Sequence, residues 1–248
     1  MNVYNTLIIG SGYSSIGYAT ACPNTVICEE HQICDTHFYL PLRSFRKKNY
    51  TPKTEEGARL LSSFNSLSLF RGNEQNANGL EFALCKYIDE KQLNILLKCR
   101  VINVNQQPDN IYDVTVHTNE GLTHLFAKRI LDTKNTSREK YFTVLFVCDE
   151  VEKVKDKLLM AYGPAEIESA FYPRRYALHV SVHDGVDENR IKLEIYEKWR
   201  TLNVDAKILY MAPVFYGKAS HNRLCDDNYE NPIEAFEAGC FFAKEING

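Results

Sequence analysis

The sequence feature that most constrains the fold is a glycine turn between a short apolar run and a segment of small residues. Residues 4–9 (YNTLII) are aliphatic and β-branched and end at Gly10, which predicts a strand of a buried parallel sheet. Residues 14–22 predict a helix, and residues 25–28 (TVIC) predict a second buried strand. Strand, helix and strand so close together in the chain predict a compact β-α-β unit.

The turn itself has the pattern of a phosphate-binding loop. In residues 10–15 (GSGYSS) the first glycine permits a tight turn, and the second lets the backbone approach a diphosphate at the helix N-terminus. Glu29 ends the second strand about 20 residues further on, where a carboxylate can bind the hydroxyls of a ribose. A glycine turn without a ligand is the alternative. The residues predicted to bind a dinucleotide here are Gly10, Ser11, Gly12, Ser14, Ser15, Glu29 and Glu30.

The middle of the chain is interpreted from its periodicity and turn residues. Residues 31–79 are polar and irregular, with a basic patch at residues 43–48, and a long excursion of this kind usually lies at a site. Amphipathic spacing predicts a helix over residues 79–90. Strands are predicted over residues 93–97, 100–104, 112–117, 124–126 and 127–132.

From residue 141 the pattern predicts a smaller α+β segment, inserted before the chain returns to the first domain. Its strands are predicted over residues 141–147, 166–171 and 177–183, and its helices over residues 151–160 and 188–199. Residues 206–211 are typical of another strand. Residues 232–246 predict the last helix, with Asn231 as its N-cap and Pro232 at its first position.

The composition argues against several classes of function. A formal net charge of -3 provides no general attraction to nucleic acid or to an anionic membrane surface. No apolar run approaches the ~20 residues of a membrane-spanning helix, so we expect a cytoplasmic protein with neither nucleic-acid nor membrane partners. The 8 cysteines occur singly, without the paired spacing of a zinc or dithiol site, and no metal is predicted.

Together these segments resemble the FAD-dependent oxidoreductases of the glutathione-reductase type. The likeness covers LIIGSGYSSIGYA, VICEE, residues 91–133 and the closing PIEAFEAGCFFAKEI, and so extends over most of the chain. The resemblance implies that FAD is the cofactor and that the backbone of Val101 contacts its adenine. It also implies that the last helix, which starts at Pro232 and Ile233, directs its positive end at the flavin ring.

The fold class implied by this resemblance is α/β, with a Rossmann-type FAD-binding parallel sheet and a β-meander. The FAD-binding domain would comprise residues 1–140 and 205–248, and the inserted α+β substrate segment residues 141–204. No second glycine-rich turn follows a later strand, so an NAD(P)H domain is not expected. Electrons would then come from the substrate or from a separate reductase.

Two positions depart from the pattern of this family. The family's return strand usually ends in Ala-Thr-Gly, whereas this chain has Thr133-Lys134-Asn135. The glycine pair expected soon after Glu29 is replaced by Cys34-Asp35. These changes keep open a second interpretation, in which the chain is a non-catalytic relative that retains the fold without flavin chemistry.

Candidate residues on the substrate side come from the later part of the chain. Lys218 and His221 precede the last helix, near the predicted flavin face, and are candidate catalytic groups. Arg174 is a candidate substrate-binding residue because a guanidinium suits a carboxylate or a phosphate, although a solvated arginine is the simpler interpretation. Tyr216 is a second candidate for binding the substrate.

The predicted function is therefore an FAD-dependent oxidoreductase that oxidises a small molecule by hydride transfer to the flavin. The alternatives are a non-catalytic partner subunit, a redox-neutral flavin-dependent isomerase and an NAD-binding dehydrogenase. The expected partner is a small-molecule substrate, and a separate reductase or a homo-oligomer is left open.

Overall fold

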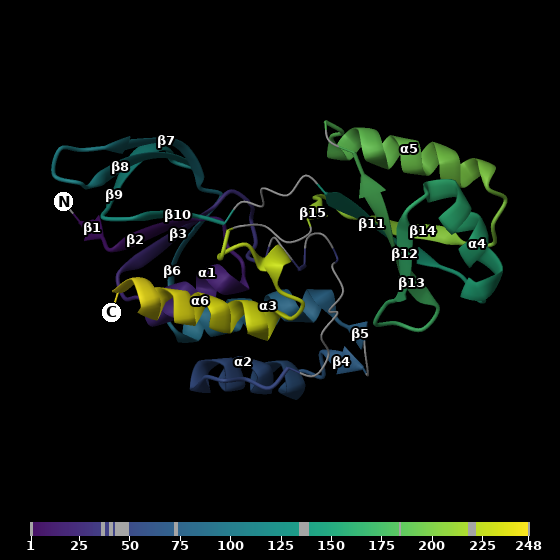
Figure 1. Cartoon of the computed structure of the whole chain (residues 1–248), viewed down its shortest axis with the longest axis horizontal. Helices are drawn as coiled ribbons and strands as arrows, with labels where there is room; N and C mark the ends of the chain where they lie inside the picture. Colours follow the sequence, from purple (N-terminus) through teal and green to yellow (C-terminus); the bar gives the residue numbers. More distant parts are fainter. Residues whose placement is uncertain are drawn as a thin grey trace.

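The computed structural model describes residues 2–35, 38–39, 42, 50–71, 74–133, 139–183, 185–217 and 222–247. Within these residues the chain forms two lobes, which lie side by side along the longest axis of the molecule (Figure 1). The first lobe contains both ends of the chain, and the second is built from residues between 140 and 217.

A four-stranded parallel sheet forms the centre of the first lobe. Its strands are β2 (Thr6–Ile9), β3 (Thr25–Glu29), β6 (Asn94–Leu97) and β10 (Ile130–Asp132). They lie in the order β10-β2-β3-β6, and every neighbouring pair is parallel. The predicted β-α-β unit is confirmed, and the carboxyl ends of its two strands meet at one edge of the sheet.

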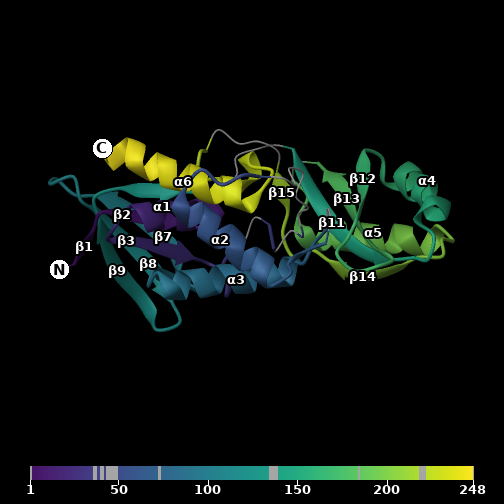
Figure 2. The same ribbon diagram turned by 90° about the horizontal axis from the view of Figure 1, so that it is seen from below.

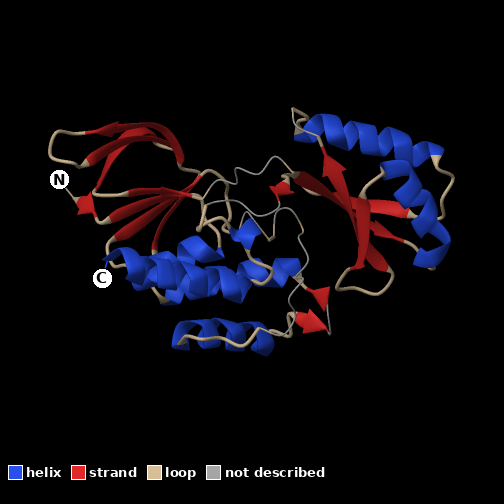
Figure 3. Cartoon of the chain, in the orientation of Figure 1, coloured by secondary structure: helices blue, strands red, loops and turns tan. Residues whose placement is uncertain are grey.

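Helices cover one face of this sheet (Figures 2 and 3). They are α1 (Tyr13–Ala21), α3 (Ala77–Glu90) and α6 (Pro232–Asn247). Ile8 and Ile27 point from the central strands into the core that these helices share. Because side chains alternate along a strand, the neighbouring Leu7 and Val26 point to the opposite face.

A second sheet covers that opposite face. It contains β1 (Val3–Tyr4), β7 (Arg100–Gln106), β8 (Tyr112–Thr118) and β9 (Gly121–Ala127), in the order β1-β9-β8-β7. The predicted meander is confirmed. The prediction of a single strand over residues 4–9 was wrong, because Asn5 interrupts it and separates β1 from β2. Tyr4 pairs with Ala127 of the meander, whereas Thr6 begins the pairing with β3.

The excursion between β3 and α3 contains a helix that was not predicted. Helix α2 (Glu55–Ser66) begins at Thr54, whose side chain accepts a hydrogen bond from the Gly57 amide, and it buries Leu60 and Phe64. Leu60, Leu61 and Phe64 follow helical spacing, so α2 is amphipathic, but it lies in a segment whose polar composition predicted irregular structure. A short hairpin of β4 (Phe70–Arg71) and β5 (Glu74–Gln75) follows. The basic patch at residues 43–48 lies outside the described residues.

The second lobe is a mostly antiparallel sheet packed against two helices. Its strands are β11 (Lys140–Val147), β12 (Ala165–Ser169), β13 (Arg175–Val182), β14 (Lys207–Met211) and β15 (Tyr216–Gly217). Helices α4 (Val151–Tyr162) and α5 (Glu188–Thr201) bury Leu158, Ile195 and Trp199 against it. Both β14 and β15 pair with β11. The sheet therefore extends beyond residue 204, where the sequence analysis ended the inserted segment.

Helices α1 and α6 cross at two glycines. A β-carbon on Gly17 would lie 1.8 Å from the carbonyl oxygen of Phe236, and one on Gly239 would lie 1.9 Å from the carbonyl oxygen of Ser14. The Cys240 thiol donates a hydrogen bond to the Gly17 carbonyl at 3.2 Å. The two helix backbones are thus in direct contact, which fixes the last helix of the chain against the first. No helix among the described residues is long and apolar enough to cross a lipid bilayer.

We expect Gly17→Ala and Gly239→Ala each to lower the free energy of unfolding by about 3 kcal/mol, because the added methyl group overlaps a backbone carbonyl that cannot move independently. Denaturant titration followed by circular dichroism measures this change. Ser62→Ala, on the exposed face of α2, is the control and should alter stability by less than about 0.5 kcal/mol. Wild-type stability in both glycine variants would contradict the direct contact.

Candidate functional site

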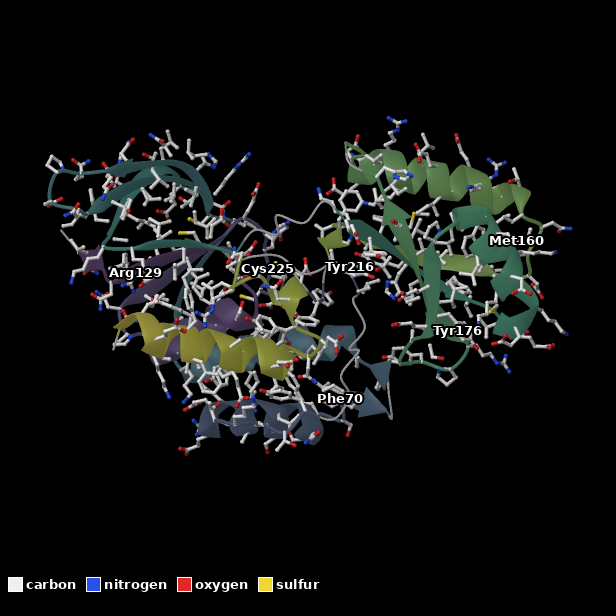
Figure 4. The ribbon with its side chains drawn as sticks, viewed as in Figure 1. Phe70, Arg129, Met160, Tyr176, Tyr216 and Cys225 are labelled. Carbon is white, nitrogen blue, oxygen red and sulfur yellow. The ribbon has the colours of Figure 1, made fainter. Side chains whose placement is uncertain are left out.

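A cavity of about 550 Å³ lies at the carboxyl edge of the parallel sheet, between the two lobes. Gly10 and Glu29 line it from the ends of β2 and β3, and Val101 lines it from β7. Phe215 and Tyr216 line it from the second lobe. Figure 4 shows Tyr216 at the end of the second lobe that faces the first. Ligands of open α/β sheets bind at this edge, so the cavity is the candidate functional site.

The turn after β2 requires glycine at its first position. Gly10 has a φ of +96°, and a β-carbon there would lie 2.1 Å from Thr133 Oγ1. The Thr133 hydroxyl donates to the carbonyl of Ile9 at 2.9 Å, which holds β10 against the start of the turn. Thr133, one of the residues that depart from the family pattern, therefore packs directly on the glycine turn.

Ser15 stands where the third glycine of the pattern usually lies, and its hydroxyl braces the turn. Its Oγ donates to the Gly10 carbonyl at 3.0 Å and accepts from the Gly12 amide at 3.4 Å. The serine is accommodated because these backbone groups lie within reach of its short side chain.

Asp35 stands where the family has a glycine, and it takes a backbone conformation that glycine adopts easily. Its φ is +62°, a region that aspartate tolerates better than most residues. The Asp35 amide donates to the Ser11 carbonyl at 3.1 Å. The segment after β3 thus returns to the glycine turn despite the substitution.

Glu29 is buried, with 2% of its surface exposed, and donors of this chain reach both of its oxygens. Oε2 accepts from the amide and the hydroxyl of Ser11, at 2.7 and 2.8 Å. Oε1 accepts from the His31 amide at 2.8 Å and lies 2.7 Å from His31 Nδ1. Burial alone would raise the pKa of Glu29, but these hydrogen bonds outweigh it and hold the pKa below 4.5.

His31 lines the cavity and remains partly exposed. Its hydrogen bond with the Glu29 carboxylate raises its pKa above the ordinary value of 6.5, against the opposing effect of burial. The pair places a protonatable group beside the carboxylate predicted to bind a ribose.

The N-terminus of α1 is bound by the carboxylate of Asp226, from the short 3-10 helix η1 (Asp226–Asn228). The Tyr13 amide donates to Oδ2 at 2.6 Å, and the Ser14 amide donates to Oδ1 at 2.9 Å. The Ser14 hydroxyl donates to Oδ1 as well. Asp226 is completely buried. Its neighbour Cys225, labelled in Figure 4, lies in the first lobe.

The predicted site residues at or beside the cavity fall into two groups. Gly10, Glu29, Glu30, Val101 and Tyr216 line the cavity together. Ser11, Gly12, Ser14 and Ser15 form the buried turn beside it. Glu30 is exposed and lies 3.6 Å from Arg100. Tyr216 is held by a stacked Tyr141 ring at 5.4 Å and by the edge of His179 at 5.7 Å.

Other predicted residues lie away from the cavity. Arg174 is exposed at the turn before β13, where it pairs with Asp149 at 2.9 Å, and it does not line the cavity. Pro232 and Ile233 begin α6 and are buried without lining the cavity. Lys218 and His221 lie outside the described residues, as do Lys134 and Asn135. The predicted N-cap is confirmed, since Asn231 Oδ1 accepts from the Ile233 amide at 2.8 Å.

Three residues at the site, His31, Asp226 and Asp227, were not predicted from the sequence. Asp226 and Asp227 stand in a mostly polar stretch before the last helix, so no local pattern marks them as buried carboxylates with defined partners. Asp227 lines the cavity and accepts from the Gly217 amide at 2.9 Å, which links η1 to β15. Among the described residues, no group of three or more His, Cys, Asp or Glu side chains could hold a metal ion.

Comparison with known proteins identifies the fold. No protein-family model matches the chain, and no curated protein sequence matches it. Among solved structures, p-nitrophenol 4-monooxygenase from Pseudomonas putida DLL-E4 is similar at a TM-score of 0.54 and 11% identity, over 98% of this chain and 78% of that one. OxyS anhydrotetracycline hydroxylase from Streptomyces rimosus is similar at a TM-score of 0.62 and 11% identity, over 100% of this chain and 63% of that one.

A third similar structure is the ternary complex of aklavinone-11 hydroxylase with FAD and aklavinone, at a TM-score of 0.55 and 11% identity, over 99% of this chain and 63% of that one. At such low identity these likenesses show the fold alone. The chain thus has the mixed α/β fold found in flavoprotein hydroxylases and monooxygenases. This agrees with the expected α/β class, and the glutathione-reductase type stays a prediction.

The pair of Glu29 and His31 should make stability depend on pH. Because the folded-state pKa of His31 is raised, its contribution is complete below about pH 6.5 and is lost as the pH rises through that raised value. The contribution of Glu29 is complete above about pH 4.5 and is lost as the pH falls through its lowered value. The pair therefore stabilises the fold most between these two limits.

His31→Gln should remove the decline in melting temperature that this pair causes above about pH 6.5, measured by thermal unfolding between about pH 5 and pH 8. His117→Gln, at an exposed position of β8, should keep the wild-type profile. Identical profiles for the wild type and His31→Gln would contradict the role of the pair.

Proposed function

We propose that the chain is an FAD-dependent oxidoreductase that acts on a small molecule bound between its two lobes. The observation that carries the proposal is the buried carboxylate of Glu29, held beside the glycine turn at the edge of a cavity that opens on the carboxyl ends of β2 and β3. The FAD named for aklavinone-11 hydroxylase, which is similar in fold, supports the choice of cofactor.

The residues present fit the adenosine end of FAD. The cavity of about 550 Å³ has the size of a ligand site. Glu29 would bind the ribose hydroxyls through lone pairs that Ser11 and His31 leave in place, since each carboxylate oxygen can accept more than one hydrogen bond. The Val101 backbone would contact the adenine. Glu30, at the rim, would contribute to the same end of the site.

The residues present also fit a diphosphate at the start of α1. The amides of Tyr13 and Ser14 already bind the two oxygens of a carboxylate, so they are oriented for an anion. Gly12 leaves the backbone bare on this side, and Ser11, Ser14 and Ser15 hold the turn in shape. In this structure the Asp226 carboxylate binds the amides that we propose for the diphosphate.

When bound, FAD supplies two-electron redox chemistry at its ring, and the protein supplies binding, orientation and electrostatics. The start of α6 at Pro232 and Ile233 would place the positive end of a helix dipole towards the flavin. Lys218 and His221 are the proposed proton-transferring groups. Tyr216 and Phe215 provide an aromatic wall from the second lobe for a small substrate, and Arg174 is a more distant candidate.

The proposed reaction is oxidation of the substrate by hydride transfer to the flavin, so the substrate supplies both electrons. A separate reductase would be the source of electrons only if it reduced the flavin before the substrate reacted. The finer assignments belong to the same proposal: the glutathione-reductase type, an FAD-binding domain in residues 1–140 and 205–248, a substrate segment in residues 141–204, and a cytoplasmic location. The same proposal includes, as an alternative to a separate reductase, the assembly of several copies of this chain into a homo-oligomer.

A second candidate function is a cofactor-free partner subunit. One observation favours it: the amides of α1 and the carboxylate of Glu29 already have partners within the chain, Asp226 for the amides and His31 for the carboxylate. A protein built in this way could keep the fold without a cofactor, because the amides that begin α1 and the Glu29 carboxylate would keep their partners.

FAD binding separates the two functions. We expect the purified protein to bind FAD, detected by the visible absorption spectrum after reconstitution and gel filtration, and to release FAD on denaturation. Glu29→Gln should weaken binding about tenfold, because it removes the charge that accepts the ribose hydroxyls. Glu120→Gln, in the exposed turn between β8 and β9, should bind as the wild type does. A wild-type protein that takes up no FAD would favour the cofactor-free function.

A further inference from the structure

The carboxylate of Asp226 lies over the second glycine of the turn. A β-carbon on Gly12 would be 2.5 Å from Asp226 Oδ2. This bare backbone is where a diphosphate approaches a dinucleotide-binding turn. The carboxylate also accepts hydrogen bonds from the Tyr13 and Ser14 amides, at 2.6 and 2.9 Å. An anionic ligand could bind these amides only in the position that the Asp226 carboxylate now occupies, so the two exclude each other.

The other amides of the turn have partners as well. The Gly10 amide donates to the Cys28 carbonyl at 2.8 Å, and the Ser11 amide donates to Glu29 at 2.7 Å. The Gly12 amide lies 3.4 Å from Ser15 Oγ. A diphosphate therefore gains its hydrogen bonds at the start of α1 by replacing those of Asp226.

We propose that Asp226 is an internal competitor for the diphosphate, which binds α1 only after displacing this carboxylate. This inference rests on the proposed function. Asp226 stabilises the ligand-free chain by neutralising the start of α1, and that stabilisation opposes ligand binding. Removing the carboxylate should have opposite effects on the two states, lowering the stability of the free protein and raising its affinity for the ligand.

The contact is held from both sides, so its exchange is a defined conformational step. Ser14 Oγ lies 2.7 Å from the Leu224 carbonyl oxygen, next to η1, and this carbonyl and Asp226 Oδ1 share its single proton. On the other side, Asp227 accepts from the Gly217 amide at 2.9 Å. Gly217 follows Tyr216, which lines the cavity. The segment that carries the competitor therefore also contacts the wall of the proposed substrate site.

The test compares Asp226→Ala with the wild type for two probes, FAD and adenosine, by isothermal titration calorimetry. We expect Asp226→Ala to bind FAD about tenfold more tightly, which corresponds to about 1.4 kcal/mol. Adenosine has no phosphate, so its affinity should change by less than about twofold. The melting temperature of the ligand-free variant should fall, because two amides of α1 lose their partner.

Two further variants keep the test decisive. Asp226→Asn preserves the shape of the side chain and removes its charge, so it should fold if the alanine variant does not, and it should bind FAD about threefold more tightly. Asp187→Ala removes a carboxylate that caps α5 through the amides of Asn189 and Arg190 at 2.9 Å. It should lower the melting temperature and leave the FAD affinity unchanged.

Each outcome separates this inference from the proposed function. Equal or weaker FAD binding by both Asp226 variants, with FAD binding by the wild type, overturns the competitor and leaves the proposed function in place. FAD binding by an Asp226 variant and not by the wild type supports the competitor and favours the cofactor-free function for the wild-type chain. No FAD binding by any variant overturns both.

Discussion

The amides that begin α1 have no carbonyl partner within the helix, and the way they are satisfied shapes the whole first lobe. They lie at the carboxyl edge of the parallel sheet, directly after the glycine turn, and they are buried. Buried amides need hydrogen-bond acceptors, and an anion is the favoured acceptor at a helix N-terminus. In this structure the anion is Asp226, which comes from the opposite end of the chain. The contact holds η1 against the start of α1. Further along both helices, α1 and α6 cross closely at Gly17 and Gly239.

The same device recurs elsewhere in the lobe. Glu237 of α6 is completely buried, and its Oε1 accepts from the amides of Lys53 and Thr54 at 2.7 and 2.6 Å. Its Oε2 accepts from the Tyr50 hydroxyl at 2.6 Å. These contacts hold the start of α2, a helix with few apolar positions, against the last helix of the chain. Buried carboxylates at helix N-termini thus join segments that sequence separates widely, and each is tolerated because its oxygens are hydrogen-bonded.

Much of the architecture could be predicted because it depends on local patterns. The glycine turn, the apolar runs of β2 and β3 and the N-cap Asn231 each report on a few neighbouring residues. The position of Glu29 at the end of β3 brought it to the cavity, as its spacing predicted. Helix α2 was missed because the polar composition of residues 31–79 concealed its amphipathic spacing, and its contact with Glu237 of the last helix leaves no local pattern. The pairing of β14 and β15 with β11 could not be predicted, because an isolated strand pattern does not say which sheet it joins.

The sequence by itself determined the β-α-β unit, the need for glycine at the turn and the carboxylate that follows it, because backbone sterics and side-chain alternation act within a few residues. Only the tertiary structure decided what occupies the start of α1, and that Tyr216 from the second lobe closes the cavity opposite Glu29. Ser14 and Asp226 are 212 residues apart, and no local pattern records a partner at that distance. Such a contact exists only after the chain has folded, because burial is what makes an unpartnered amide costly enough to require it.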